Sequence, residues 1–262
     1  MKPLQRICDL LRRCGGTRPT DAKAHFHTAI LLAAGNGARM GGSDAKQFLP
    51  LAGKPVIVHT LQCFQSCPYI REIVLVVRAQ DAPVYDGYRK EYRLTKLKKI
   101  VEGGESRQIS AMRGFYQIDP ACDYISIHDG ARCLLTVEQL SALIRTAYAE
   151  NGAVAAATPA KDTVKIVDAA HRVVKTPDRA TVWLAQTPQI FPVSVYEAAL
   201  AVAQRDAITV TDDCSLAEYA GFSVHLLDCG SENLKITTPD DLELAQIILT
   251  RRAQSAEQEA ST

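Results

Sequence analysis

The sequence predicts an α/β protein built on a single doubly wound, mostly parallel sheet with a projecting β-hairpin arm. Short apolar runs at residues 29–32, 73–77 and 124–127 are typical of strands that are buried on both faces. Segments with helical periodicity separate these runs, and strands that alternate with helices favour parallel pairing. Two glycine-rich stretches follow predicted strands, as expected where loops leave the carboxyl edge of such a sheet.

Composition limits the classes of protein that fit. The 262 residues allow one large domain or two small ones, and a hydrophobic content of 47% supports a sizeable core. The formal net charge of +1 argues against a broad nucleic-acid surface, and no apolar run is long enough to span a membrane. The eight cysteines lack the spacing of a metal site or a redox pair. We therefore expect reduced thiols and a cytoplasmic protein.

The loop after the first predicted strand carries the strongest functional signal. The strand at residues 29–32 opens into Gly35 and Gly37, and the same loop contains two cations, Arg39 and Lys46. Backbone N–H groups of a glycine-rich loop form a nest that suits phosphate oxygens. The loop is therefore expected to bind a substrate with several negative charges, such as a nucleoside triphosphate.

Three kinds of phosphate-binding loop compete for this pattern. A dinucleotide-binding loop would need a third glycine where Met40 stands, and should lead directly into a helix. A P-loop would need Lys followed by Ser or Thr where Ser43 and Asp44 stand. The loop of sugar-nucleotide-type nucleotidyltransferases, with an A-G-x-G-x-R-M run and a following lysine, fits best.

The elements as far as the third core strand are predicted by periodicity and capping signals. They are a helix at 56–67, a strand at 73–77, a solvated polar segment at 79–99, a helix from a Ser106 cap to about residue 117, and a strand at 124–127. A second glycine loop, Gly103 and Gly104, precedes the second helix. Asp129 follows the third strand at the same sheet edge. An aspartate there can be a turn residue, a helix cap or a metal ligand; we favour a ligand for Mg²⁺, which usually takes one or two carboxylates.

The second half of the chain continues the alternation, with one interruption. The predicted elements are a helix after the Thr136 capping box that ends at Asn151, a strand at 153–158, hairpin strands at 163–168 and 172–176, a return to the sheet at 186–191, helices at 193–204 and from Thr211 to Gly221, a strand at 222–227, an extended piece at 233–237 and a last helix after Thr238. The hairpin lies within an arm at about 160–182 and is expected to contact a second subunit. The flanking segments, 1–27 and 253–262, are expected to be a poorly ordered extension and a frayed tail around a domain at 28–252.

Taken together, these motifs resemble the signature of the methylerythritol phosphate cytidylyltransferases of isoprenoid precursor synthesis, which share a Rossmann-like nucleotidyltransferase fold. The motifs that carry the resemblance are A-A-G-x-G-x-R-M at 33–40 with K-Q-F at 46–48, G-G-x-x-R-x-x-S at 103–110, H-D-G-A-R at 128–132, D-T-x-K at 162–165, Q-T-P-Q at 186–189, T-D-D at 211–213 and N-x-K-x-T at 233–237. The resemblance implies that CTP condenses with 2-C-methyl-D-erythritol 4-phosphate and that pyrophosphate leaves. It also implies a magnesium ion and a homodimer formed through the arm.

The resemblance further implies a role for each matching residue. Arg39 and Lys46 are expected to stabilise the transition state, and Asp129 to hold the metal. The residues expected to position the substrates are Arg179, Lys235, Thr163, Thr187 and Thr211. The residues expected to line the cytidine nucleotide site are Ala33, Ala34, Gly35, Gly37, Gly104, Ser110, Asp129 and Gly130.

Three alternatives remain open at the level of the sequence. A ribitol 5-phosphate cytidylyltransferase would share the fold and mechanism, but its first loop usually reads A-G-G rather than Ala33-Ala34-Gly35. An NADP-dependent reductase is suggested by Gly35 and Gly37 and would not need CTP. A silent nucleotide-binding regulator is disfavoured by the simultaneous presence of Arg39, Lys46, Asp129 and Lys235, since a binder needs no cations placed for catalysis.

Overall fold

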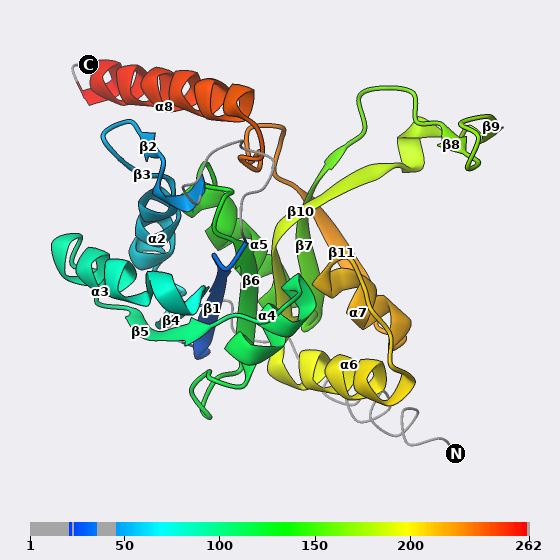
Figure 1. The fold of residues 1–262 in the computed structure, drawn as a ribbon, viewed down its shortest axis with the longest axis horizontal. Helices are drawn as coiled ribbons and strands as arrows, with labels where there is room; N and C mark the ends of the chain where they lie inside the picture. The colour runs from blue at the N-terminus through cyan, green and yellow to red at the C-terminus, as the bar shows by residue number, and fades with distance from the viewer. Residues whose placement is uncertain (1–20, 23, 36–45, 261–262) are drawn as a thin grey trace.

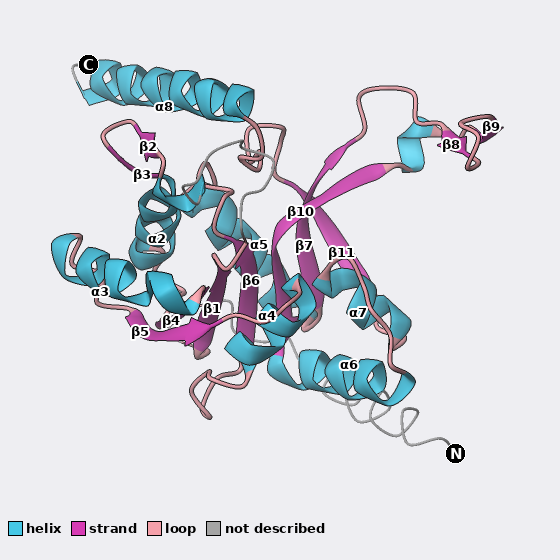
Figure 2. Cartoon of the chain, in the orientation of Figure 1, coloured by secondary structure: helices cyan, strands magenta, loops and turns pink. Residues whose placement is uncertain are grey.

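A seven-stranded sheet forms the centre of the computed structural model, which describes residues 21–22, 24–35 and 46–260. The strands are β1 (His27–Leu32), β4 (Glu72–Val77), β5 (Leu97–Glu102), β6 (Tyr124–Asp129), β7 (Ala153–Pro159), β10 (Trp183–Pro192) and β11 (Val224–Asp228). Their order is β11-β7-β10-β6-β1-β4-β5, and β10 alone among them runs antiparallel to its neighbours (Figures 1 and 2). The predicted mostly parallel, doubly wound sheet is therefore confirmed.

Within the described part of the chain, six helices cover the two faces of this sheet. They are α2 (Val56–Ser66), α3 (Ala82–Glu91), α4 (Arg107–Phe115), α5 (Val137–Glu150), α6 (Val193–Asp206) and α7 (Asp213–Tyr219). Helices α2, α3 and α5 pack on one face and α4, α6 and α7 on the other. Successive strand residues point to opposite faces: Leu31 contributes to the first cluster and Ile30 to the second. Both faces of β1 are thus buried, which accounts for its continuous apolar run.

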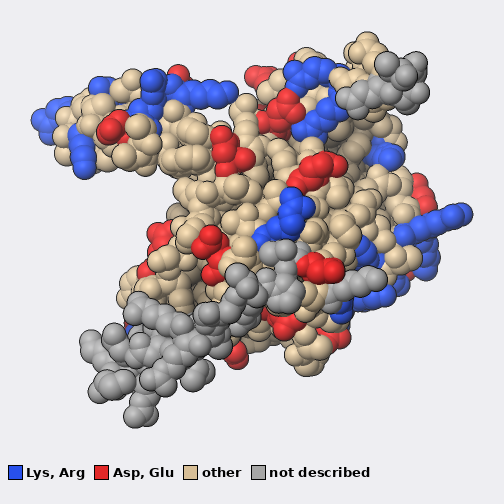
Figure 3. Space-filling view, turned by 180° about the vertical axis from the view of Figure 1, so that it is seen from behind, with Lys and Arg blue, Asp and Glu red and all other residues tan. Residues whose placement is uncertain are grey.

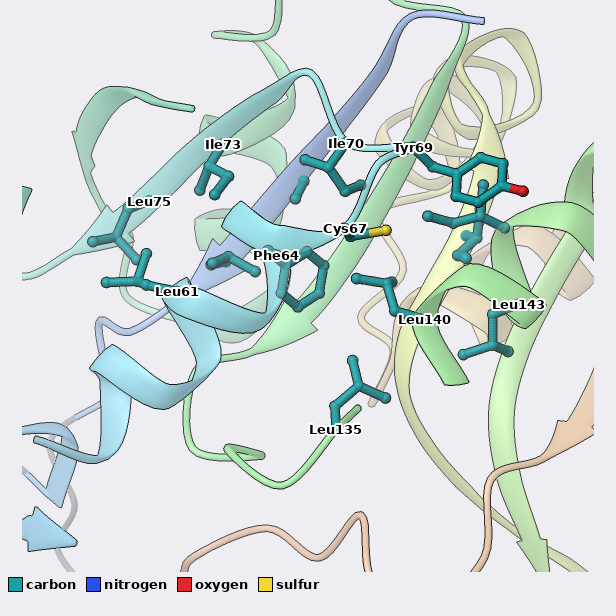
Figure 4. Packing of buried hydrophobic residues seen from close by; sticks show 14 of the residues in the cluster. Leu61, Phe64, Cys67, Tyr69, Ile70, Ile73, Leu75, Leu135, Leu140 and Leu143 are labelled. Atoms are coloured by element: carbon teal, nitrogen blue, oxygen red, sulfur yellow. The ribbon is translucent and has the colours of Figure 1, made fainter. Parts of the chain in front are cut away.

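The packing of α2 and α5 shows how the expected helical faces are used. Leu61 and Phe64 of α2 and Leu140 and Leu143 of α5 belong to one buried cluster on this face of the sheet (Figure 4). The predicted capping box of α5 is present, because the Thr136 hydroxyl accepts from the backbone of Gln139 and the Gln139 side chain accepts in return. Local sequence rules therefore located these two helices correctly.

The segment at 79–99 differs from the prediction of a solvated polar stretch. It contains a 3-10 turn, η3 (Ala79–Asp81), helix α3 and the start of β5. Tyr85 is the one fully buried side chain of α3, and it packs with Phe48 and Tyr88. This helix contains few apolar residues and has a glycine, Gly87, in its interior, so the sequence pattern did not reveal it.

The carboxyl-terminal region also differs. Helix α8 (Pro239–Ala260) extends into residues 253–262, the segment expected to be a frayed tail. Helix α7 begins at Asp213 after an Asp212 cap, not at Thr211. Residues 233–237, expected to be an extended piece, form a connection without regular secondary structure. Of the expected extension at 1–27, residues 1–20 and 23 lie outside the described residues, and His27 already belongs to β1.

The predicted arm is present between β7 and β10. Its hairpin consists of the short strands β8 (Ile166–Val167) and β9 (Val173–Lys175), and a 3-10 turn, η4 (Arg179–Thr181), leads back to the sheet. The arm projects away from the sheet and carries Lys and Arg side chains on its outer surface (Figures 1 and 3). Among the described residues, no helix has the length and apolar character needed to cross a membrane.

Two small elements lie under α8. A ribbon of β2 (Pro50–Leu51) and β3 (Lys54–Pro55) follows the 3-10 turn η2 (Lys46–Phe48). Ala245 and Ile248 of α8 pack against Leu51 and against the loop after β6. Lys235 belongs to the loop before α8. This contact places that loop beside η2 and the end of β6.

Candidate active site

The site lies where the winding of the sheet reverses. The chain passes from β1 to β4 and β5 on one side, and then crosses to β6 on the other side of β1. Ligands of open α/β sheets bind outside the carboxyl ends of the strands at such a point. A cavity of about 570 Å³ opens there. It is lined by Leu32, Ala34, Gly35, Lys46, Gln47, Arg78, Ala79, Gln80, Glu102, Gly103, Gly104, Glu105, Ser106, Arg107, Ser110, Asp129, Ala131 and Lys235.

Two loops approach each other closely on one side of the cavity. A Cβ atom on Gly103 would lie 2.5 Å from Cβ of Ala34 and 3.0 Å from Oγ of Ser110, so the second loop needs glycine at this position. The amide of Gly104 donates to Oγ of Ser110 over 3.0 Å, and Ser106 caps α4. The predicted meeting of the two glycine loops at one sheet edge is thus confirmed for their described residues.

Residues of η2 connect the first loop to the opposite side of the cavity. Gln47 is buried, and its Nε2 donates to the carbonyls of Ala33 and Gly35, at 3.1 and 3.3 Å. The neighbouring Lys46 has only 9% of its surface exposed, and its Nζ donates to the carbonyl of Ile236 over 2.8 Å. Lys46 is therefore held between the first loop and the loop that carries Lys235.

Asp129, the last residue of β6, is the electrostatic centre of the cavity. Its Oδ1 accepts from Nε of Arg107 at 3.1 Å, and its Oδ2 accepts from Nζ of Lys235 at 2.7 Å. Burial by itself raises the pKa of Asp129, but the charges of Arg107 and Lys235 outweigh burial, and the net result is a pKa well below the usual range. The carboxylate is therefore ionised at any physiological pH.

Thr187 and His128 fix the backbone at Asp129. Oγ1 of Thr187 accepts from the Asp129 amide and donates to Nδ1 of His128, both over 3.0 Å. His128 in turn donates from Nε2 to the carbonyl of Arg132 over 3.1 Å. Burial lowers the pKa of His128 to about 4, so the ring is neutral and can accept at Nδ1. Thr187 thus orients Asp129 from behind, without lining the cavity.

This geometry can be compared with known proteins. The profile of the family "2-C-methyl-D-erythritol 4-phosphate cytidylyltransferase" matches residues 27–251. The chain belongs to this family. A cytidylyltransferase of that name from Alkaliphilus metalliredigens is 41% identical over 226 residues, covering 86% of this chain and 93% of the relative. One from Syntrophus aciditrophicus is 43% identical over 224 residues, covering 85% and 95%.

Solved structures of cytidylyltransferases agree with this assignment. The crystal structure of 4-diphosphocytidyl-2C-methyl-D-erythritol synthase from Anaerococcus prevotii superposes with a TM-score of 0.76 at 31% identity, covering 88% of this chain and all of that one. The cytidylyltransferase of Francisella tularensis gives a TM-score of 0.71 at 30% identity, covering 84% and 98%. The family and the enzyme class expected from the sequence, a nucleotidyltransferase of isoprenoid precursor synthesis, are confirmed. The reductase and the silent binder are accordingly set aside.

Not every residue that the family resemblance singled out reaches the cavity. Gly37 and Arg39 lie outside the described residues. Thr163 and Arg179 are exposed on the arm, where Arg179 donates to the carbonyl of Lys161, and Thr211 is exposed before α7. None of these last three lines the described cavity.

Gly130 also lies outside the cavity lining, although it was expected to line the nucleotide site. It is buried, and its amide donates to the carbonyl of Leu32 over 2.9 Å. A Cβ atom there would lie 2.6 Å from Cδ1 of Ile57. Gly130 therefore permits close packing of β6 on β1 and α2, while its neighbours Asp129 and Ala131 line the cavity.

Sequence reasoning left other residues of the site without a role. Arg107 and Gln47 stood inside recognised motifs, yet spacing gave no reason to place Arg107 on Asp129 or Gln47 on the carbonyls of the first loop. Asp213 stood in a third motif, and it is the second carboxylate bound by Arg107, at 2.7 Å from Nη1. The only available signal was the presence of these side chains in the family motifs.

The donor set of the cavity fits a magnesium ion held by one protein carboxylate. Among the described residues, no three His, Cys, Asp or Glu side chains gather into a metal-binding group. Mg²⁺ commonly takes only one or two carboxylates and completes its shell with phosphate oxygens and water. Asp129 is ionised, buried and part of the cavity lining, whereas Asp213 does not line the cavity and the lining residues Glu102 and Glu105 are exposed. Asp129 is therefore the ligand that fits.

Proposed function

We propose that this chain transfers the cytidylyl group of CTP to 2-C-methyl-D-erythritol 4-phosphate and releases pyrophosphate, using the cavity at the carboxyl edge of β1 and β6. The observation that carries the proposal is the convergence of Lys46, Arg107 and Lys235 with Asp129 around one cavity. Cations gathered around one buried carboxylate suit a substrate pair with several phosphate groups.

The chemistry requires no nucleophile from the protein. An oxygen of the sugar phosphate attacks the α-phosphorus of CTP, and the bond between that phosphorus and the bridging oxygen of the pyrophosphate breaks. Negative charge grows on the leaving group while two anions are brought together, so positioning and cations supply most of the catalysis. We assign the stabilising role to Lys46 and, beyond the described residues, to Arg39.

Lys235 is assigned to the sugar phosphate. Nζ of Lys235 is bound to Oδ2 of Asp129, so a phosphate that attracts Lys235 leaves this oxygen available. We assign Mg²⁺ to Asp129, where it would neutralise phosphate charge and favour departure of pyrophosphate. The backbone groups of Ala34, Gly35 and Gly104, with Ser110, are assigned to the nucleotide because they line the same cavity.

The arm supports a homodimer in which each subunit completes the other's site. Val173 and Val174 expose 59% and 68% of their surfaces on the arm, and Ile166 and Val167 are similarly exposed. Apolar side chains on a short projecting hairpin need a partner surface for stability. Arg179 and Thr163 lie on this arm, away from the cavity of their own chain, and we assign them to the sugar-phosphate site of the partner.

The cytoplasm is the compartment that we assign to the protein. All six cysteines in the described part of the chain are free thiols. Burial raises the pKa of the Cys63 and Cys133 thiols to about 12, so these thiols stay protonated and unreactive. Free thiols of this kind suit a reducing compartment.

The decisive experiment measures pyrophosphate release with Mg²⁺, pairing CTP, ATP, GTP or UTP with methylerythritol 4-phosphate or ribitol 5-phosphate. Release with CTP and methylerythritol phosphate alone is the expected result. Release with ribitol phosphate instead would keep the mechanism and overturn the substrate. Absence of release with every pair would contradict the roles of Lys46 and Lys235.

A further inference from the structure

Four side chains from four elements form a continuous series that ends at the cavity. The hydroxyl of Tyr196 on α6 donates to Oδ1 of Asp213 on α7 over 2.8 Å. Oδ2 of Asp213 accepts from Nη1 of Arg107 on α4 over 2.7 Å, and Nε of Arg107 reaches Oδ1 of Asp129 on β6. The series thus runs from the helical layer on one face of the sheet to its carboxyl edge.

The end farthest from the cavity is rigid. Asp213 is 2% exposed and Tyr196 is fully buried. Burial and the Asp213 carboxylate raise the pKa of Tyr196 well above its usual value, so its hydroxyl keeps its proton. The amides of Asp213 and Cys214 both donate to Oε1 of Gln189, which fixes the start of α7. Asp213 is therefore a fixed carboxylate that cannot reach a ligand itself.

Arg107 is held between the two carboxylates. It contacts Asp129 through Nε alone, while Nη1 is bound to Asp213. Nη2 shares an edge of the guanidinium with Nε and has no acceptor among the described residues. A guanidinium without such a second partner tends to close on one carboxylate with two parallel N–H bonds. The bond from Nη1 to Asp213 therefore fixes an orientation of the guanidinium in which Nη2 does not reach Asp129, and Oδ2 is left to the exchangeable partner Lys235.

We propose that Asp213 and Tyr196 are positioning residues for the transfer reaction, which act through Arg107 to keep one oxygen of Asp129 accessible to ligands in the cavity. The inference rests on the proposed role of Asp129 in the nucleotide and metal site. Replacing Asp213 by asparagine removes the charge that holds Nη1, and Arg107 then closes on Asp129. Replacing a residue that hydrogen-bonds to a metal ligand commonly lowers metal affinity or activity by roughly 10- to 100-fold.

The test compares Asp213→Asn and Tyr196→Phe with Glu72→Gln. Glu72 is a matched control because it is also a buried carboxylate; it accepts from Thr28 and Asp119 at the amino end of β4, the opposite edge of the sheet. Two quantities are measured: binding of Mn²⁺ in the presence of CTP, by electron paramagnetic resonance, and kcat and KM for pyrophosphate release at saturating Mg²⁺.

For Asp213→Asn we expect Mn²⁺ binding weakened by roughly 10-fold or more and a fall in kcat, with a smaller change of the same kind for Tyr196→Phe. In the double variant the effects should be less than additive, because both changes act through Arg107. Glu72→Gln should lower only the melting temperature. If Asp213→Asn had the Mn²⁺ affinity and kcat of the wild type but a lower melting temperature, the four side chains would only stabilise the fold. That result would overturn the proposal.

Two safeguards keep the outcome interpretable. If Asp213→Asn does not fold, Tyr196→Phe still tests the proposal, since it removes one hydroxyl and leaves the ring in place; unchanged Mn²⁺ binding and kcat in that variant would then overturn the proposal. If the wild-type protein releases no pyrophosphate, the proposed function fails, while the Mn²⁺ comparison between the variants still decides whether Asp213 positions Asp129.

Discussion

Nζ of Lys235 lies 2.7 Å from Oδ2 of Asp129, so the lysine assigned to the sugar phosphate and the carboxylate assigned to the metal neutralise each other. Each ligand must therefore separate this ion pair in order to bind. Binding of one ligand then lowers the cost of binding the other, which is a coupling free energy between the two substrates. The ion pair between Lys235 and Asp129 therefore couples binding of the sugar phosphate to binding of the metal and nucleotide.

The first prediction follows from this ion pair. Lys235→Met should raise KM for methylerythritol phosphate by roughly 10-fold or more, since a charge-assisted phosphate contact is worth about 1.5–3 kcal/mol. The same change should strengthen Mn²⁺ binding in the absence of sugar phosphate, because Asp129 loses a competing cation. Steady-state kinetics and Mn²⁺ titration check both effects, with Lys90→Met, on the exposed surface of α3, as the control. Weaker Mn²⁺ binding in Lys235→Met would contradict the coupling.

The second prediction concerns the close approach of the two glycine loops. Gly103→Ala would place a methyl group 2.5 Å from Cβ of Ala34, so one loop must move away from the other. Because a displacement of about 1 Å in a phosphate site can cost roughly 10²-fold in rate, kcat/KM for CTP should fall by 10- to 100-fold.

Gly87→Ala is the matched control for this substitution. A Cβ atom on Gly87, inside α3, meets nothing within 4 Å, and alanine in a helix is more stable than glycine by roughly 0.5–1 kcal/mol. Thermal melting should therefore show Gly87→Ala at or above the wild-type temperature, with unchanged kinetics. If Gly103→Ala were as active as Gly87→Ala, the contact between the loops would have no part in CTP binding.

The sequence was informative wherever the determinant was local. The strand before Gly35, the Thr136 capping box and the Ser106 cap depend on neighbouring residues, and the structure has all three. Helix α3 could not be recognised, because its only fully buried side chain, Tyr85, is anchored by partners in other elements.

In the candidate site too, the sequence identified residues but not their contacts. The glycine-rich loop and the end of the third strand brought Lys46 and Asp129 into the prediction, and a family motif added Lys235. All three line the cavity. What spacing could not supply is which side chains touch: Lys46 binds the carbonyl of Ile236, which is 190 positions away, and Arg107 binds Asp213, 106 positions away. Such contacts depend on the order of strands in the sheet, which no local pattern encodes.

The third prediction is a loss of stability in mild acid caused by His27. This histidine is fully buried at the amino edge of the sheet and bonds through its two ring nitrogens to Ser126 and Tyr148. Burial lowers the pKa of His27 to about 3, below the value of about 6.5 for an unfolded chain. The unfolded state therefore binds a proton first, so the contribution of His27 is complete above pH 6.5 and is lost progressively as the pH falls towards 3.

The measurement for this prediction is chemical unfolding at pH 7.5, 6, 5 and 4. By pH 4 the loss due to His27 should reach roughly 3 kcal/mol. His27→Gln should be less stable than the wild type at pH 7.5 and should lose less stability on acidification. His171→Asn, in the exposed turn of the arm, is the control and should follow the wild type. An identical pH dependence in wild type and His27→Gln would show that other groups cause the acid sensitivity.

The last prediction separates the role of Lys46 in turnover from a role in holding the structure together. Lys46→Met keeps the length of the side chain but removes the ammonium group, which lines the cavity and donates to the carbonyl of Ile236. Loss of a group that stabilises charge in the transition state costs roughly 10²- to 10³-fold in kcat, while KM for CTP should change little. Lys54→Met, on the neighbouring ribbon strand β3, removes a lysine bound to Gln62 outside the cavity and should retain wild-type kinetics. A Lys46→Met enzyme with normal kcat and a lower melting temperature would assign Lys46 to the attachment of the 233–237 loop rather than to the reaction.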